Sequence, residues 1–242
     1  MSDTKLSHHS ELEAKLVADG LKVGDFKRFM LMNYDIQQYK QIKGPDTYYE
    51  QGVHVVRYRF DSRHHKNEVT VKRRKSVTST RDRLEIDLPL ATGTQPIDID
   101  GFLCASGFKR AFTIVKEGHV YWTRLSKSLE ASIVYYTCWE VDISKREAGT
   151  IAIAETLPPV HGSIHTFIEI EAEKGSAVSQ KTAERRIQEQ VKIFREEFGL
   201  DKPVNKSLYE IYSGKPYAMK EKENVEEQVA GDGLTSVRGL RH

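Results

Sequence analysis

Charged side chains at every second position are the feature of this sequence most able to do chemistry. The stretch "SELEAKL" (10–16) places Glu11, Glu13 and Lys15 on one side of an extended chain, with leucine and alanine on the other. Late in the chain, "FIEIEAE" (167–173) repeats the pattern with Glu169 and Glu171. Carboxylate oxygens are the ligands that Mg²⁺ and Mn²⁺ prefer, so the two acidic segments together indicate a divalent-cation site.

The segments between these two carry bases at the corresponding positions. They supply Arg57, Arg59, Lys72, Arg83 and Lys116. Such side chains bind phosphate oxygens through charge-assisted hydrogen bonds. If both sets face one interior, the acids require a cation and the bases an anion, because two like charges about 4 Å apart repel by roughly 4 kcal/mol at an effective dielectric constant near 20. A divalent metal ion with a polyphosphate satisfies both requirements.

An antiparallel sheet with one solvated, charged face is the competing interpretation, and it fits any single strand better. It does not explain why the acids and the bases lie on different strands. A charged interior does explain it, provided that the sheet closes into a barrel and that helices cover its apolar outer face.

The alternating pattern, broken by turn residues, predicts about eight antiparallel strands. Besides the first segment, the expected strands are 53–60, 68–76, 83–88, 111–116, 120–125, 133–143, 149–155 and 165–173. Apolar residues at helical spacing and turn residues predict helices at 23–32, 96–108, 179–200 and 205–214. The predicted fold class is therefore α+β: an eight-stranded antiparallel β-barrel, a tunnel with a charged interior, covered by several helices.

The 242 residues, 38% of them hydrophobic, are enough for one domain with a core. We expect this domain to span residues 1–216 and a flexible charged tail to follow at 217–242. No apolar run approaches the roughly 20 residues that a membrane span needs, and Cys104 and Cys138 lack metal-site spacing. These features predict a cytoplasmic protein with no membrane partner; the oligomeric state is left open, a homodimer included.

The order of several short motifs resembles the CYTH family of triphosphate tunnel metalloenzymes, over residues 10–213. The motifs are Glu11-x-Glu13-x-Lys15, "DTYY" (46–49), Arg57-x-Arg59, "TVK" (70–72), "GFKRAFTIVK" (107–116), "FIEIE" (167–171) and "KSLYEI" (206–211). The resemblance implies an eight-stranded antiparallel tunnel in which acids hold one or two metal ions and bases bind a triphosphate.

The resemblance also assigns roles to single residues. It implies that the metal ligands and catalytic acids are Glu11, Glu13, Glu169 and Glu171, with Asp142 as a further candidate ligand. It implies that the phosphate-binding residues are Lys15, Arg57, Arg59, Lys72, Arg83 and Lys116. One position departs from the family pattern, because a second basic residue commonly lies two positions after Lys116 and this chain has Gly118 there. Arg124 is the candidate replacement.

The implied activity is metal-dependent phosphohydrolysis, with Mg²⁺ or Mn²⁺ as cofactor. The substrate would be inorganic triphosphate, a nucleoside or thiamine triphosphate, or the 5′-triphosphate end of RNA. Two alternatives stay open. A class IV-type adenylyl cyclase would convert ATP into cyclic AMP and pyrophosphate, although the sequence shows no motif for a purine pocket. A non-catalytic polyphosphate or nucleotide binder is less favoured, because it gains nothing from four inward carboxylates.

Overall fold

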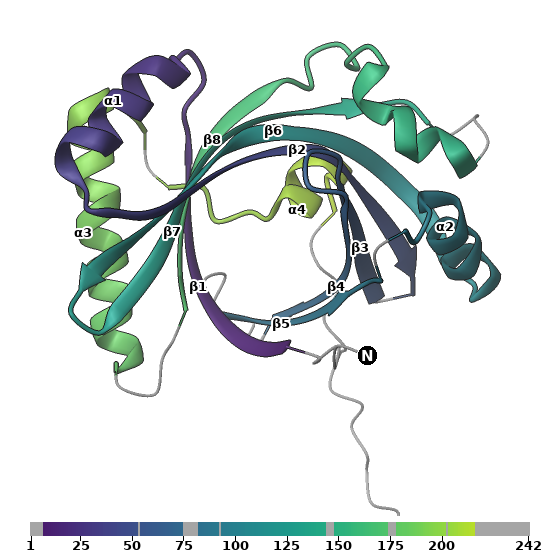
Figure 1. Ribbon diagram of the computed structural model, residues 1–242, viewed down its shortest axis with the longest axis horizontal. Coiled ribbons are helices and arrows are strands. Elements are labelled where there is room, and N and C mark those ends of the chain that lie inside the picture. Colours follow the sequence, from purple (N-terminus) through teal and green to yellow (C-terminus); the bar gives the residue numbers. More distant parts are fainter. Residues whose placement is uncertain are drawn as a thin grey trace, which may run out of the picture.

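Eight antiparallel strands form a closed barrel in the computed structural model (Figure 1). Around the barrel their order is β1-β5-β4-β3-β2-β6-β7-β8. The strands are β1 (Ser7–Val17), β2 (Ile36–Gln51), β3 (His54–Asp61), β4 (Lys66–Arg74), β5 (Asp82–Pro89), β6 (Lys109–Ser126), β7 (Leu129–Val141) and β8 (His165–Glu173). Because β1 pairs with both β5 and β8, every strand has two neighbours. The expected eight-stranded tunnel, the fold implied by the resemblance to the CYTH family, is confirmed.

The structure describes residues 7–52, 54–74, 82–91, 93–143, 148–173, 178–201 and 203–215; of residues 7–11, 72–74, 82–85, 148, 149 and 173 it describes the backbone only. The expected tail at 217–242 lies outside these ranges. Within them, no helix is both long enough and apolar enough to cross a membrane.

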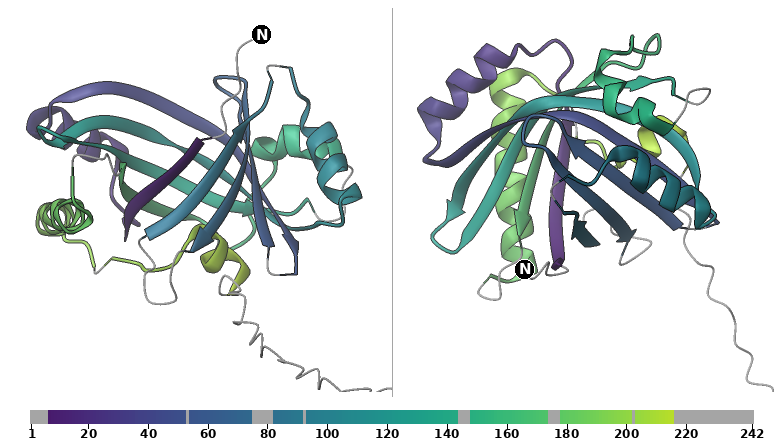
Figure 2. Two further views of the ribbon diagram at one scale, coloured as in Figure 1. Left: turned by 90° about the horizontal axis from the view of Figure 1, so that it is seen from below. Right: turned by 45° about the vertical axis from the view of Figure 1, so that its right-hand side comes forward.

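The outer face of the barrel is apolar and is covered by helices on two sides (Figure 2). On β1, Leu12, Ala14 and Leu16 are buried in a core with the helices α1 (Val23–Asn33) and α3 (Gln180–Phe198). Burying a leucine side chain contributes about 2 kcal/mol. This packing fixes which face of β1 turns outward, and strand alternation then turns Glu13 and Lys15 inward.

The covering helix α3 follows directly from its sequence. Ala183, Ile187, Val191 and Phe194 recur at helical spacing and are its buried residues. The side chain of Ser179 accepts a hydrogen bond from the backbone of Thr182 at the start of the helix. Gly199, with a φ of 64°, takes the left-handed conformation that ends it. The predicted helix 179–200 is confirmed.

The opposite side of the barrel is covered by α2 (Pro96–Ala105) and the 3₁₀ helix η1 (Ala148–Thr156). Leu103 of α2 and Ile151 and Ala154 of η1 pack with Val115 of β6 in a second core. A third cluster lies at one end of the barrel, where Leu208 and Tyr209 of α4 (Leu208–Ser213) pack with Phe112 and other residues of the strands. The barrel is therefore supported on both flanks and at one end.

Three sequence expectations about secondary structure were wrong. Residues 111–116 and 120–125 form one continuous strand, β6, because Gly118 stays extended and paired with Tyr136. Residues 149–155 alternate like a strand but form the 3₁₀ helix η1, whose apolar residues pack against the barrel. Strand β2 was not predicted, because its first half is largely polar and Gly44 and Pro45 follow in the middle of the strand. The nine expected segments therefore become eight strands, because two merge, one is a helix and β2 is added.

Candidate functional site

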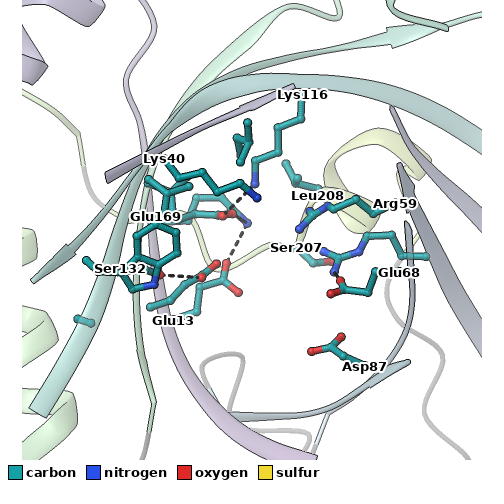
Figure 3. A pocket seen from close by; sticks show the side chains of 18 of the residues that line it. Glu13, Lys40, Arg59, Glu68, Asp87, Lys116, Ser132, Glu169, Ser207 and Leu208 are labelled. Carbon is teal, nitrogen blue, oxygen red and sulfur yellow. Dashed lines mark hydrogen bonds and ion pairs between the residues drawn. The ribbon is translucent and has the colours of Figure 1, made fainter. Parts of the chain in front are cut away.

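A cavity of about 550 Å³ lies inside the barrel, and much of its lining is charged (Figure 3). The described lining includes five basic residues, Lys15, Lys40, Arg57, Arg59 and Lys116. It also includes six acidic residues, Glu13, Glu68, Asp87, Glu130, Glu169 and Glu171. The described charges in the lining are therefore balanced to within one.

Four of these residues form what we call the β1–β8 wall: Glu13, Lys15, Glu169 and Glu171. In the antiparallel ladder, Lys15 lies opposite Glu169, and Glu13 lies opposite Glu171. Lys15 Nζ is 2.8 Å from Glu169 Oε1 and 3.0 Å from Glu13 Oε1. Lys15 is 2% exposed and Glu169 5%, so this ion pair is shielded from water and each charge depends on the other.

Glu169 is held by three groups. Besides Lys15, the Tyr136 hydroxyl donates to Oε1 at 2.6 Å, and Lys116 Nζ lies 3.5 Å from Oε2. Lys116 Nζ also lies 3.6 Å from the centre of the Tyr136 ring, a cation–π contact. Burial would raise the pKa of Glu169, but Lys15 and Lys116 outweigh it and hold that pKa well below its usual range. Glu169 is thus ionised and is shared as a partner by the two lysines.

Glu13 and Glu171 lie next to this group and face each other across β1 and β8. Glu171 accepts a hydrogen bond from Ser132 Oγ at 3.1 Å. Side chains directly opposite in an antiparallel pair have Cβ atoms about 5 Å apart, and both carboxylates line the cavity. Lys15 offsets part of the charge of Glu13, and the remaining repulsion between the two carboxylates favours a further cation at this position.

The second charged region is the β2–β3–β4 wall: Asp46, Arg57, Arg59, Glu68 and Thr70. Arg59 donates two hydrogen bonds to Asp46, from Nε and Nη2, each 2.7 Å long. Arg57 Nη2 donates to Thr70 Oγ1 at 2.8 Å and to Glu68 Oε1 at 3.1 Å. These partners are direct neighbours or diagonal neighbours in the β2–β3 and β3–β4 ladders. The strands therefore hold both guanidinium groups in fixed positions.

Arg59 and Arg57 differ in how many of their guanidinium N–H groups have hydrogen-bond partners. Burial would raise the pKa of Asp46, but Arg59 above all, with Arg57 and Lys116, lowers it to about 2, so the pair of Arg59 and Asp46 stays ionised. Arg57 Nε is buried and meets no hydrogen-bond partner in the described part of the chain. A buried donor without a partner costs about 1–3 kcal/mol. Arg57 thus lines the cavity with one guanidinium nitrogen bonded to Thr70 and Glu68 and with its Nε unsatisfied.

Apolar side chains complete the lining. They include Ile42, Tyr48, Val120, Trp122, Val134, Leu208 and Tyr209. Leu208 and Tyr209 come from α4, whose first turn is held by a capping box between Ser207 and Glu210. The predicted helix at 205–214 therefore has a place in the site, at one end of the cavity.

The structure brings most of the predicted site residues together. Those with described side chains in the lining are Glu13, Lys15, Arg57, Arg59, Lys116, Glu169 and Glu171. The side chains of Glu11, Lys72 and Arg83 lie outside the described part; in the ladder, Glu11 pairs with Glu173 and with Arg83. Asp142 follows the end of β7, is exposed, and is not among the lining residues. The structure therefore does not bring Asp142 to the others.

The structure explains why a glycine occupies position 118. A Cβ atom there would come within 2.5 Å of Tyr136 Cβ and closer still to the carbonyl oxygen of Tyr135. β6 cannot carry a side chain at this position unless β7 shifts. Arg124 does not take over the role, because it is 55% exposed, pairs with Glu130 at 3.5 Å, and is not among the residues that line the cavity.

Sequence reasoning missed Lys40, Asp46, Glu68 and Tyr136 as site residues. Glu68 lies two positions before Thr70 on a strand that was predicted, so alternation could have found it. Asp46 begins the "DTYY" motif, which was noticed without a role for its acid. Lys40 lies in the unpredicted strand β2, and Tyr136 lies in the predicted strand 133–143 among other apolar and aromatic residues. Neither had a signal in the pattern alone.

The donors fit a metal ion that is shared with a substrate better than a closed metal cage. Among the described side chains there is no group of three or more His, Cys, Asp or Glu that could hold a metal ion. Mg²⁺, however, keeps several waters and binds through one or two carboxylates plus substrate phosphates. Glu13 and Glu171 meet that requirement. Glu169 instead holds Lys15 and Lys116, which differs from the ligand role that the resemblance implies.

Comparisons with known proteins show likeness in fold only. No protein-family model matches the chain, and no curated protein sequence matches it. A conserved hypothetical protein from Pyrococcus furiosus is 18% identical, with a TM-score of 0.52, over 83% of this chain and 98% of that one. A chain of the Schizosaccharomyces pombe Mediator head module is 10% identical, with a TM-score of 0.52, over 81% and 100%. The mimivirus capping enzyme triphosphatase, at 12% identity and a TM-score of 0.41 over 76% and 89%, is too distant to carry an argument.

Proposed function

We propose that the tunnel binds a triphosphate together with Mg²⁺ or Mn²⁺ and hydrolyses it. The observation that carries this proposal is the cavity lining, in which buried lysines and arginines lie beside two facing carboxylates. The fold by itself does not decide the function, since a chain of the Mediator head module has a similar fold. The charges inside this barrel are the specific feature.

The balance of charges explains why a metal belongs to the proposal. Five basic and six acidic described residues line the cavity, so a triphosphate entering alone would meet little excess positive charge. A divalent cation that enters with it supplies that charge. The six acids would otherwise oppose a polyanion, and this is the physical reason to prefer a metal–triphosphate complex over a free anion.

The residues have separable roles in this proposal. Arg57, Lys15 and Lys116 bind and orient phosphate oxygens, while Glu169 keeps both ammonium groups in place. Glu13 and Glu171 would hold the metal ion, which when bound neutralises charge on the phosphoryl group that is transferred to water. The basic residues stabilise the charge that spreads over the same oxygens, since they are already fixed by ion pairs before the substrate arrives.

Assays of phosphate release test the proposal. Inorganic triphosphate, ATP and a 5′-triphosphate RNA oligonucleotide are incubated with the protein and Mg²⁺ or Mn²⁺, and cyclic AMP is measured in parallel. We expect phosphate release from at least one substrate, abolished by a chelator and by Glu171→Gln. Glu189→Gln, on the surface of α3, is the matched control and should keep full activity.

The same assays separate the alternatives. Formation of cyclic AMP and pyrophosphate from ATP would replace the hydrolase with a cyclase. Tight binding of triphosphate with no turnover under either metal would leave a non-catalytic binder, and the proposed function would then be wrong.

A further inference from the structure

Lys40 of β2 lines the tunnel although no motif predicted it. It borders both the main cavity and a neighbouring cavity of about 160 Å³, and Arg59 and Lys116 border the same two. Figure 3 shows Lys40 and Lys116 extending from the barrel wall toward the middle of the cavity. Lys40 therefore lies with Lys116, to which the proposed function gives a role in binding phosphate, and with Arg59 of the β2–β3–β4 wall.

Lys40 forms an ion pair with Asp61 of β3. Its Nζ is 2.7 Å from Asp61 Oδ2. Asp61 also contacts His64 Nδ1 at 2.9 Å and accepts a hydrogen bond from the backbone N–H of His64 at 3.2 Å. This carboxylate is thus fixed by the turn between β3 and β4 in which His64 lies. The pair gives Lys40 a defined position.

The pair of Lys40 and Asp61 is built like the other cation pairs of the tunnel. Arg59 has Asp46 as its partner and Lys116 has Glu169, and both acids are buried. Asp61 is buried as well, at 7% exposed. Ion pairs on the outer helices differ, because in Lys192–Glu196 both side chains are more than two thirds exposed.

Lys40 also lies beside the one inward position of β6 that cannot carry a side chain. In the β2–β6 ladder Ile42 pairs with Gly118, and Lys40 pairs with Val120. After Lys116, the inward positions of β6 are therefore Gly118, Val120 and Trp122, none of them charged. On the adjoining strand β2, the described cation that lines the main cavity is Lys40, and it supplies a positive charge beside these uncharged positions of β6.

We propose that Lys40 is a further substrate-binding residue, whose ammonium group binds oxygens of the phosphate chain together with Lys116. This inference rests on the proposed function, because it takes a phosphate chain as the ligand of the tunnel. An ammonium group has three N–H donors, so Lys40 can keep its bond to Asp61 while it binds the ligand.

Isothermal titration of the full chain with Mg²⁺ and the imido analogue of triphosphate, whose P–N–P bridges resist hydrolysis, tests the inference. Lys40→Ala should weaken binding about ten-fold, the effect of losing one charge-assisted hydrogen bond. Lys40→Arg should stay within about three-fold of the unaltered protein, because it keeps the charge. Lys192→Ala removes a lysine from the outer surface of α3 and should leave the affinity unchanged.

Asp61→Asn distinguishes contact with the ligand from a merely structural role. It breaks the same ion pair but keeps the cation, so we expect affinity within about three-fold of the unaltered protein. Equal losses in Lys40→Ala and Asp61→Asn would overturn the inference, as would unchanged affinity in Lys40→Ala. If the unaltered protein binds no triphosphate, the proposed function itself fails, and this outcome is distinct from a failure of Lys40 alone.

Discussion

The two charged walls of the tunnel use opposite arrangements. In the β1–β8 wall one acid, Glu169, serves two lysines, Lys15 and Lys116. In the β2–β3–β4 wall each arginine has its own acid, Asp46 for Arg59 and Glu68 for Arg57. The first wall also has two further carboxylates that face each other, and the second has a guanidinium nitrogen without a partner among the described residues.

The difference shows which wall suits which ligand. A wall with facing carboxylates is suited to a cation, whereas a wall with fixed guanidinium groups is suited to phosphate oxygens, because the planar fork of arginine matches their geometry. A metal–triphosphate complex would be bound by both walls at once. Substitutions in the two walls should therefore change different measured quantities: metal-dependent turnover for the β1–β8 wall and triphosphate affinity for the β2–β3–β4 wall.

The largest expected effect is on stability and comes from the shared acid. Glu169→Gln would leave Lys116 buried without its carboxylate and Lys15 with Glu13 alone, so the free energy of unfolding should fall by about 3–5 kcal/mol. Urea unfolding followed by circular dichroism measures it. Glu189→Gln, on the surface of α3, should change it by less than about 0.5 kcal/mol. Similar small losses in both variants would show that Glu169 is not the common partner of the lysines.

The next effect is on catalysis. Glu171→Gln should lower kcat for triphosphate about a hundred-fold or more, because it removes a proposed ligand of the metal ion. The amide oxygen can still accept the hydrogen bond from Ser132, so the free energy of unfolding should change by less than about 1 kcal/mol. Phosphate release and urea unfolding are measured on the same preparation. Unchanged kcat would remove the metal role from this wall.

A smaller effect concerns the pH dependence of the second wall. The folded-state pKa of Asp46, about 2, lies below its ordinary value of 3.8. Its ionised form therefore stabilises the fold above pH 3.8, and this contribution is lost as the pH falls through about 2. The difference in unfolding free energy between the unaltered protein and Asp46→Asn should shrink by about 2 kcal/mol from pH 5 to pH 2. A constant difference across this range would contradict the assignment.

The smallest effect concerns substrate affinity. Arg57→Ala should raise KM for triphosphate about ten-fold and leave kcat nearly unchanged, since it removes a phosphate contact and no proposed metal ligand. Arg185→Ala, an arginine on the surface of α3, is the control and should leave KM unchanged. If KM is the same in Arg57→Ala and the unaltered protein, Arg57 does not contact the phosphate chain.

The sequence was sufficient for the charged face but not for its pairings. Alternation placed Glu13, Lys15, Glu169 and Glu171 on one face because a strand with a buried outer side tolerates no shift in register. Alternation could not show that Glu169 forms ion pairs with two lysines. One of them, Lys116, lies on β6, which is separated from the β8 strand of Glu169 by β7. Contacts between strands distant in sequence carry no local signal.

The incorrect secondary-structure predictions also arise from contacts between segments that are distant in sequence. The segment 149–155 alternates, yet tertiary packing of Ile151 and Ala154 makes it a 3₁₀ helix. The polar beginning of β2 hid a strand, and with it Lys40, because pairing with β6 rather than an apolar pattern defines it. Gly118 was recognised as unusual, but the close approach of Tyr136 that requires it is visible only in three dimensions.

The near balance of charge in the lining also bears on how the tunnel would be loaded. With five basic and six acidic described residues, the described lining has no excess positive charge for a triphosphate that enters without a cation. Under the proposed function each ligand therefore raises the affinity for the other by the same factor, as thermodynamic linkage requires. The barrel would act as a coincidence detector, filled only when free divalent cation and triphosphate are present together.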